Sequence, residues 1–248
     1  MSSYTDFSLF YDLFTRDVDY SARTDYLCEI FKRYSKMPTL LLDVACGTGN
    51  FSLEFAKRGV SVIGIDMSED MLSVAKEKSA KQNADILFLS QKADEIELYG
   101  TVDGAVCCLD SVNHIVNYNE LVRSFKRISL FLEKDCLFVF DVNTEYKQKN
   151  ILGNNVFLLE EDNVFCVWDN FYDGAKKYTY INIDFFKRTD NGSYDRFSES
   201  FCERVYSHEQ LTRALTAAGL KVEKVFHENT FKKPKDTSSR IVYVARKV

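Results

Sequence analysis

Two glycines and two carboxylates have the types and spacing of a ligand-binding loop. Residues 40–50 (LLLDVACGTGN) form a short apolar run that ends in Asp43 and passes into a turn containing Gly47 and Gly49. Glycine adopts positive φ and lets a ligand approach the backbone, and the start of the helix expected next offers unpaired N–H groups and a partial positive charge. A second apolar run ends in Asp66. The pattern predicts a site for a nucleotide-like ligand.

Two ligands could occupy this loop. Gly47 and Gly49 after a strand, with Asp66 roughly 20 residues downstream, are typical of dinucleotide sites. However, Ser52 replaces the third glycine of that pattern, and Asp43 would face the pyrophosphate. Like charges ~4 Å apart repel by ~4 kcal/mol at an effective dielectric constant near 20. Asp43 would instead attract the ammonium and sulfonium groups of S-adenosylmethionine, which we favour.

The three histidines are spread along the chain. His114 follows the fourth apolar run, at the strand end where ligands bind in open sheets, so a structural and a catalytic role are both open. We expect His208, in the first turn of a helix, at the surface, and His227, in a late strand, in a structural role. No cysteine or carboxylate stands at ligand spacing from a histidine, so the sequence predicts no metal site.

The elements that position these residues alternate in type. This alternation predicts βαβ units, a mostly parallel sheet and helices on both of its faces. The expected strands are 40–44, 60–66, 86–89, 102–109 and 136–142, and the expected helices are 20–35, 51–59, 68–81 and 119–132.

The pattern changes near residue 150. Residues 155–206 alternate apolar and polar positions between turn signals, which predicts four antiparallel strands at 157–160, 164–171, 178–187 and 194–206. Ser207 and Gln210 then form a capping-box pattern for a helix that ends at Gly219. Strands at 221–227 and 240–246 complete the main sheet. We therefore expect an N-terminal aromatic lid or helical segment (1–36), a ligand-binding domain (37–150 and 207–248) and a β insert (151–206).

Composition restricts the partners. The 248 residues carry a net charge of -5, without the basic footprint of a nucleic-acid-binding protein. We expect a cytoplasmic protein that acts on a small molecule, since the sequence has no signal peptide and no apolar run of ~18 residues that could enter a membrane. Its seven cysteines are expected as free thiols. Exposed edges of the insert leave a monomer or a homodimer through the insert open.

The motifs resemble those of a known family. Residues 43–49 (DVACGTG), followed by residues 65–68 (IDMS) and 109–114 (LDSVNH), resemble class I S-adenosylmethionine-dependent methyltransferases over most of 40–142. The aromatic segment around Tyr11 and the insert are similar to bacterial small-molecule methyltransferases, including sugar-amine N-methyltransferases. The resemblance implies a Rossmann-like, mostly parallel seven-stranded sheet with an antiparallel insert. It also implies methyl transfer to a nitrogen or oxygen of a small molecule, with S-adenosylhomocysteine as the product.

The resemblance also implies residue roles. Asp43 would lie near the methionyl ammonium, Asp66 would accept the ribose hydroxyls, and Met67 would pack on the adenine. Ala45 stands where the family usually has glycine, and Lys92 stands where an acid commonly meets the adenine, so the Ala93 backbone could serve instead. The full cofactor set is Tyr11, Asp43, Ala45, Cys46, Gly47, Thr48, Gly49, Asp66, Met67, Lys92, Ala93, Leu109 and Asp110.

Methyl transfer chiefly needs aligned reactants in the absence of water. If the acceptor must lose a proton, the candidate bases are His114, Asp110 and Tyr11. Trp168 and Tyr172 of the insert, with His114, are the candidate acceptor-binding residues, and we expect Asn170 on the opposite face of the strand. Two alternative functions are a non-catalytic S-adenosylmethionine sensor and an NAD-dependent oxidoreductase.

Overall fold

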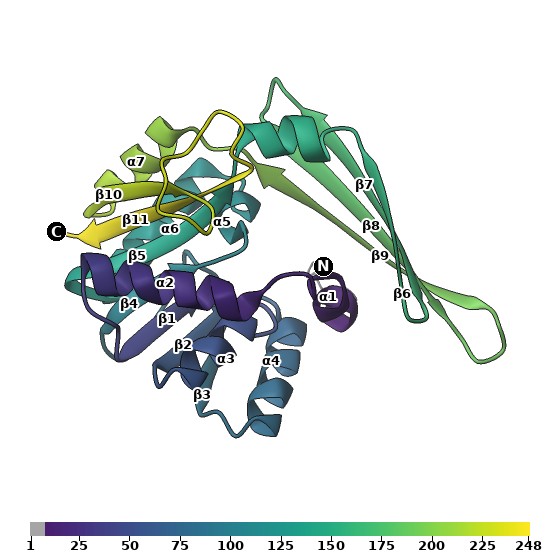
Figure 1. Ribbon diagram of the computed structural model, residues 1–248, viewed down its shortest axis with the longest axis horizontal. Coiled ribbons are helices and arrows are strands. Elements are labelled where there is room, and N and C mark those ends of the chain that lie inside the picture. Colours follow the sequence, from purple (N-terminus) through teal and green to yellow (C-terminus); the bar gives the residue numbers. More distant parts are fainter. Residues whose placement is uncertain (1–7) are drawn as a thin grey trace.

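A seven-stranded sheet forms the centre of the protein, which a computed structural model describes for residues 8–248 (Figure 1). The strand order is β10-β11-β5-β4-β1-β2-β3, and β11 alone runs opposite to the other six strands. This confirms the predicted mostly parallel sheet. The strands are β1 (Leu40–Val44), β2 (Ser61–Asp66), β3 (Ile86–Ser90), β4 (Val102–Cys107), β5 (Leu132–Asn143), β10 (Leu220–His227) and β11 (Arg240–Lys247).

Helices cover both faces of this sheet. On one face, α2 (Tyr20–Tyr34) and α3 (Asn50–Lys57) bury Phe31 and Phe55 against the strands. On the other face, α6 (Tyr118–Phe131) and α7 (His208–Ala217) bury Phe125 and Leu211. Every residue of the central strand β4 is buried, because it has helices on both sides, and this explains its apolar run without alternation. The remaining helices are α1 (Ser8–Phe14), α4 (Glu69–Lys81), α5 (Ser111–His114) and the π-helix η1 (Lys147–Leu152).

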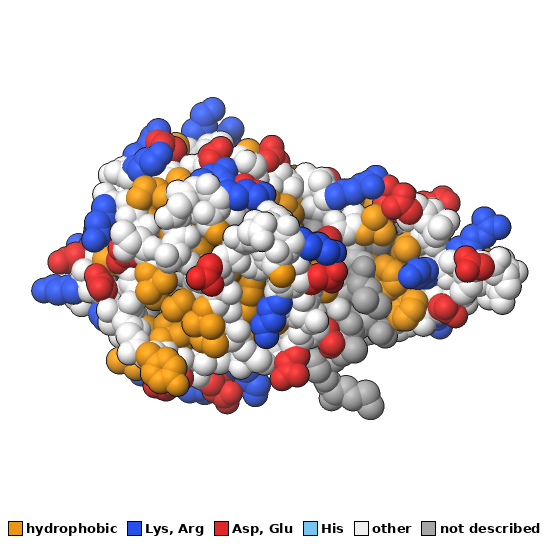
Figure 2. Space-filling view, turned by 90° about the horizontal axis from the view of Figure 1, so that it is seen from below, with side chains coloured by type: hydrophobic (Ala, Val, Ile, Leu, Met, Phe, Trp, Pro, Cys, Tyr) orange, Lys and Arg blue, Asp and Glu red, His pale blue; other side chains and the backbone are white. Residues whose placement is uncertain are grey.

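The insert is a separate antiparallel sheet in the order β6-β7-β8-β9. It extends away from the main body (Figures 1 and 2), and α1 lies between the two sheets (Figure 1). Phe10 of α1 stacks on Phe185 of the insert with ring centroids 4.7 Å apart, so α1 joins the insert to the rest of the molecule. The strands are β6 (Val156–Glu161), β7 (Val164–Asp173), β8 (Tyr178–Arg188) and β9 (Tyr194–Arg204).

One prediction about the insert is wrong. Side chains two residues apart point to the same face of a strand, so Trp168, Asn170 and Tyr172 share a face of β7. The indole N–H of Trp168 accordingly donates to Asn170 Oδ1 at 2.7 Å. Asn170 therefore belongs to the face that packs against α1 and η1, and its side chain is almost completely buried.

Within residues 8–248, no helix has both the length and the apolar character needed to cross a membrane. Residues 1–7 of the expected N-terminal segment lie outside the described part of the chain. The division of the sequence into three domains stays a prediction.

Candidate active site

Asp66 fixes the shape of the glycine loop. Its carboxylate accepts the backbone N–H groups of Gly47 and Ser68, each at 2.9 Å, and so joins the loop after β1 to the turn after β2. Burial raises the pKa of Asp66, although the backbone donors work in the opposite direction. The two sequence signals, loop and acid, therefore lie in one place.

The loop leaves room for a ligand above Gly47. A Cβ added to Gly47 would meet no atom within 4 Å, so a side chain there would enter open space beside the loop. A Cβ added to Gly49 would lie 2.9 Å from Ala75 Cβ, so this glycine serves packing against α4. Ala45 adopts the left-handed conformation (φ 55°) that glycine would favour, so the methyl group has not prevented the loop from forming. The loop thus fits a bound cofactor at Gly47.

Asp43 lies beneath the loop and is only 2% exposed. Its carboxylate accepts the Ser52 hydroxyl at 2.6 Å, and burial raises its pKa to about 7. Ser52, which departs from the dinucleotide pattern, is therefore a partner of Asp43, a role that the sequence did not reveal.

A pocket opens above this carboxylate, between the loop, α1, α2 and the end of β4. It brings together seven of the predicted cofactor residues, namely Tyr11, Asp43, Ala45, Cys46, Gly47, Thr48 and Leu109. Its other lining residues, which the sequence analysis missed, are Tyr20, Asn50, Phe51, Cys108 and Ser111. Aromatic and small polar residues at these positions carried no separate signal in the sequence.

The remaining predicted cofactor residues are not among those that line this pocket. Met67 directly follows Asp66 and is 54% exposed. Lys92 is exposed and Ala93 half-buried, both after β3. Asp94, the next acid along the chain, is engaged by Arg123 at 2.8 Å.

Helix α1 closes over the glycine loop. The Asp12 carboxylate accepts Thr48 Oγ1 at 2.7 Å and Asn50 Nδ2 at 2.9 Å, and it pairs with Lys78 Nζ at 2.8 Å. Tyr11 is thereby turned into the pocket. Burial, with Tyr20 and Asp110 nearby, raises the pKa of Tyr11 well above its usual value. Tyr11 therefore remains a neutral phenol near pH 7, which suits contact or hydrogen bonding better than proton abstraction.

Asp110 is held at the end of β4 in a constrained backbone. Leu109 and Asp110 both adopt positive φ, and their N–H groups donate to the two carboxylate oxygens of Asp141 at 2.9 and 2.7 Å. Arg240 lies 2.6 Å from Asp110 Oδ1. Burial opposes the charge of Asp110, but Arg240 and Lys147 outweigh it and lower the pKa of this carboxyl. Asp110 is therefore an anion at neutral pH, and a poor proton acceptor.

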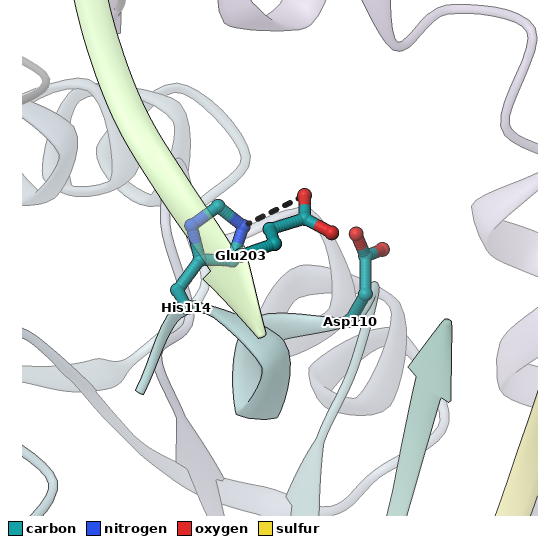
Figure 3. A group of neighbouring side chains, drawn as sticks. All are labelled: Asp110, His114 and Glu203. Carbon is teal, nitrogen blue, oxygen red and sulfur yellow. Dashed lines mark ion pairs between the residues drawn. The ribbon is translucent and has the colours of Figure 1, made fainter. Parts of the chain in front are cut away.

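Three polar side chains converge beside the pocket: Asp110, His114 and Glu203 (Figure 3). One oxygen or nitrogen from each lies within 4.8 Å of the others, and His114 Nε2 is 3.7 Å from Glu203 Oε1. Glu203 comes from β9 of the insert and is 4% exposed. Burial raises its pKa, and the nearby Asp110 adds to this rise.

Glu203 changes the argument about histidine neighbours. The sequence placed no carboxylate at ligand spacing from a histidine, but the fold brings Asp110 and Glu203 to His114, and all three are of types that bind metals. The carboxylates already receive donors from the protein: Arg240 and Asn143 on Asp110, and Asn143 and Gln148 on Glu203. The spacing in the sequence is therefore no guide to the chemistry of this cluster.

The two aromatic residues predicted to bind the acceptor lie elsewhere on the insert. Trp168 packs in the cluster between the insert and α1, and the Tyr172 hydroxyl donates to Glu145 at 3.3 Å. The other two histidines make contacts remote from the cluster, His208 with Tyr243 and His227 with Ser238, each at 3.0 Å.

Comparisons with known proteins agree with this geometry. Residues 41–135 match a methyltransferase domain family. A putative methyltransferase of Geobacillus sp. (strain WCH70) is 30% identical over 246 residues, which cover 99% of this chain and 100% of the relative. A crystal structure of an S-adenosylmethionine-dependent methyltransferase from Clostridium acetobutylicum ATCC 824 has a TM-score of 0.88 and 31% identity, covering 98% of each chain.

A relative with a named substrate is more distant. The dTDP-3-amino-3,6-dideoxy-alpha-D-glucopyranose N,N-dimethyltransferase of Streptomyces fradiae is 25% identical over 207 residues. This match covers 83% of this chain and 79% of the relative, so it includes the insert as well as the sheet.

Proposed function

Since the chain belongs to the S-adenosylmethionine-dependent methyltransferases, we propose that it methylates the amino group of a small molecule. The cluster of Asp110, His114 and Glu203 beside the cofactor pocket carries this proposal. It places two carboxylates and one imidazole around a single point next to Leu109, which lines the pocket.

The size and charge of the cluster suit an ammonium group. The three atoms lie within 4.8 Å of one another, so a nitrogen placed between them can lie about 2.8 Å or less from each, which allows charge-assisted N–H···O bonds. An ammonium group has the three N–H donors that such a site can accept, whereas a hydroxyl has one. We therefore favour an amine over an alcohol.

The pocket residues would hold the cofactor. The loop from Ala45 to Gly49 would lie under the methionyl group, with Asp43 beneath it and Asp66 on the ribose. Met67, with the Lys92 and Ala93 segment, would contact the adenine. S-adenosylmethionine supplies an electrophilic methyl group when bound.

The chain's own residues would then prepare the acceptor. Asp110, which stays ionised, anchors the ammonium, and His114 accepts one of its protons at a ring nitrogen. The N–H bond breaks, its electron pair stays on nitrogen, and the neutral amine can be methylated. Glu203, 3.7 Å from His114 Nε2, stabilises the imidazolium that forms. Tyr11 and α1 cover the pocket and exclude water.

Neither alternative from the sequence is favoured. Membership of the methyltransferase family leaves the NAD-dependent oxidoreductase without support. A non-catalytic sensor would have no use for two carboxylates and a histidine gathered next to the cofactor pocket.

Amino sugars are the first class of acceptor to test. One relative is named for an amino sugar linked to a nucleotide, and that match spans the insert. A net charge of -5 gives no general attraction for nucleic acid, which we do not propose as a substrate.

We also propose that two copies of the chain pair through strand β6. It is an outer strand of the insert sheet and, within residues 8–248, pairs only with β7. Val156 and Leu158, on one face of β6, are 55% and 64% exposed. An unpaired edge with apolar side chains favours pairing with another strand.

Matched acceptors test the amine proposal. Each amino sugar is assayed beside the sugar that carries a hydroxyl at the same carbon, and S-adenosylhomocysteine release is measured. We expect turnover of amines alone. Glu203→Gln should lower kcat/KM for the amine about tenfold to hundredfold, as expected when a hydrogen bond to a charged group is lost. Glu199→Gln, a buried acid on the same face of β9, is the control. Equal turnover of the hydroxyl compounds would refute the proposal.

A further inference from the structure

The carboxylate of Glu203 is held by two side-chain amides. Its Oε2 accepts hydrogen bonds from Gln148 Nε2 and from Asn143 Nδ2, the latter at 3.3 Å. Its other oxygen, Oε1, is thereby directed at His114, as the dashed line in Figure 3 shows. The orientation of the Glu203 carboxylate is therefore set by the amides of Gln148 and Asn143, which bind the oxygen that does not face His114.

Gln148 belongs to η1 and is completely buried. A primary amide can offer either its oxygen or its nitrogen, so something has to decide which end meets Glu203. Thr179 of β8 does so: its hydroxyl, which is also fully buried, donates to Gln148 Oε1. This contact turns the Nε2 donors of Gln148 towards Glu203. Single π-helical turns are frequent at functional sites, and here the turn carries this amide inward.

We infer that Gln148, oriented by Thr179, is a positioning residue that favours the charged form of Glu203 and directs its carboxylate at His114. Gln148 and Thr179 do not belong to the cluster of Asp110, His114 and Glu203 that would bind the acceptor. Through this arrangement, contacts between η1 and the insert influence the charge beside the site. The inference rests on the proposed function for its catalytic meaning, but the contacts themselves do not depend on it.

The groups around Glu203 have opposing effects on its pKa, and Gln148 is one of those that lower it. Burial raises the pKa of Glu203 and Asp110 adds to the rise, whereas His114 and the donors on Gln148 and Asn143 lower it. Loss of the Gln148 donor should therefore favour the protonated, neutral carboxyl. The charged groups facing the Glu203–His114 pair are Asp110, with Arg240 and Lys147 beside it, and Asp66 across the pocket.

The test follows the ring signals of His114 by NMR while the pH of the protein without acceptor is varied. In Glu203→Gln, we expect the ring signals of His114 to change at lower pH than in the native protein, because the carboxylate beside the ring is gone. Gln148→Leu should move the His114 titration in the same direction by a smaller amount. In the double variant, Gln148→Leu should add nothing, because Glu203 is no longer there to be positioned.

Two results would overturn the inference. One is a His114 titration in Gln148→Leu that matches the native protein. The other is a shift from Gln148→Leu that is as large in the Glu203→Gln background as in the protein that keeps the native acid, which would show that Gln148 acts through general structure.

Two further variants keep the test decisive. Asn170→Leu removes a different buried amide, which lies in the insert and contacts Trp168 and a backbone carbonyl instead of Glu203, and should leave the His114 titration unchanged. Thr179→Val leaves the Gln148 amide free to rotate, and should shift the His114 titration in the same direction as Gln148→Leu. It takes the place of Gln148→Leu in the test if Gln148→Leu does not fold. Because no acceptor is added, failure here and failure of the amine assay are separate results.

Discussion

At the scale of single residues, Asp66 and Asp43 have different partners at the glycine loop. Asp66 is tied to the backbone of the loop after β1 and of the turn after β2. Asp43 lies underneath and is bound by Ser52. The two acids, which look alike in the sequence, therefore have different environments, and different changes should follow from replacing them.

Asp66→Ala should weaken S-adenosylmethionine binding by ~1–3 kcal/mol, because hydrogen bonds to a charged acceptor are lost. Isothermal titration calorimetry measures the change. Asp70→Ala, which removes an exposed acid from the first turn of α4, is the control and should bind normally. An unchanged dissociation constant in Asp66→Ala would remove this residue from the site.

Asp43 should make stability depend on pH. Its pKa is about 7 in the folded protein, against about 3.9 in an unfolded chain, so between these values the folded state binds more protons. The free energy of unfolding should therefore fall as pH rises from about 4 to 7. Asp43→Asn should lose this dependence, worth about 2 kcal/mol between pH 5 and pH 8. Urea unfolding at several pH values, without ligand, measures the free energy of unfolding of the two proteins. The same change of this free energy with pH in both would contradict the raised pKa of Asp43.

At the scale of elements, α1 acts as a cover fixed on two sides. Asp12 binds it to the glycine loop and to Lys78 of α4, while Phe10 and the Arg16–Glu161 ion pair bind it to the insert. A cofactor that lies under Tyr11 has to pass this helix. Release of α1 should therefore limit how fast the cofactor leaves.

Lys78→Met should speed dissociation of S-adenosylmethionine about fivefold, since a half-buried ion pair is worth ~1 kcal/mol. Stopped-flow fluorescence can follow it, because Trp168 is the single tryptophan and packs in the cluster with Phe10. Lys81→Met removes an exposed pair with Glu77 on the same helix and should leave the rate unchanged. Equal rates in all three proteins would mean that α1 does not control exit.

Local signals were enough to predict most elements. The capping box of Ser207 and Gln210 does begin α7, and the turns at Asp173-Gly174 and around Asn191-Gly192 do separate the insert strands. These signals act within a few residues, so the sequence contains them. The prediction that Asn170 lies on the opposite face of β7 is wrong, because residues two apart in a strand share a face, as the bond from Trp168 to Asn170 shows.

At the scale of the whole molecule, the candidate site depends on a residue that no local pattern could identify. Glu203 reaches His114 only because the insert returns to the main domain at the end of β9. The same return places Gln148 and Thr179 behind it. The glycine loop could be predicted since strand, turn and acid are close in sequence, whereas this cluster is assembled by the fold.

The outer edge of the insert gives a prediction about assembly. Leu158→Lys should place a charge in the proposed pairing of β6 with β6 of a second copy, and so convert a dimer into a monomer. Sedimentation of both proteins over a range of concentrations measures this. Thr189→Lys, in the hairpin after β8, serves as a control for added charge. A native protein that sediments as a monomer throughout would refute the pairing.

The most direct test of an amine acceptor is to find where the methyl group goes. The protein is incubated with S-adenosylmethionine that carries a ¹³C-labelled methyl group and with the matched amino and hydroxy sugars, and the products are examined by NMR. The carbon shift distinguishes a methyl group on nitrogen from one on oxygen. The cluster of Asp110, His114 and Glu203 predicts label on nitrogen, and label on oxygen would contradict this account.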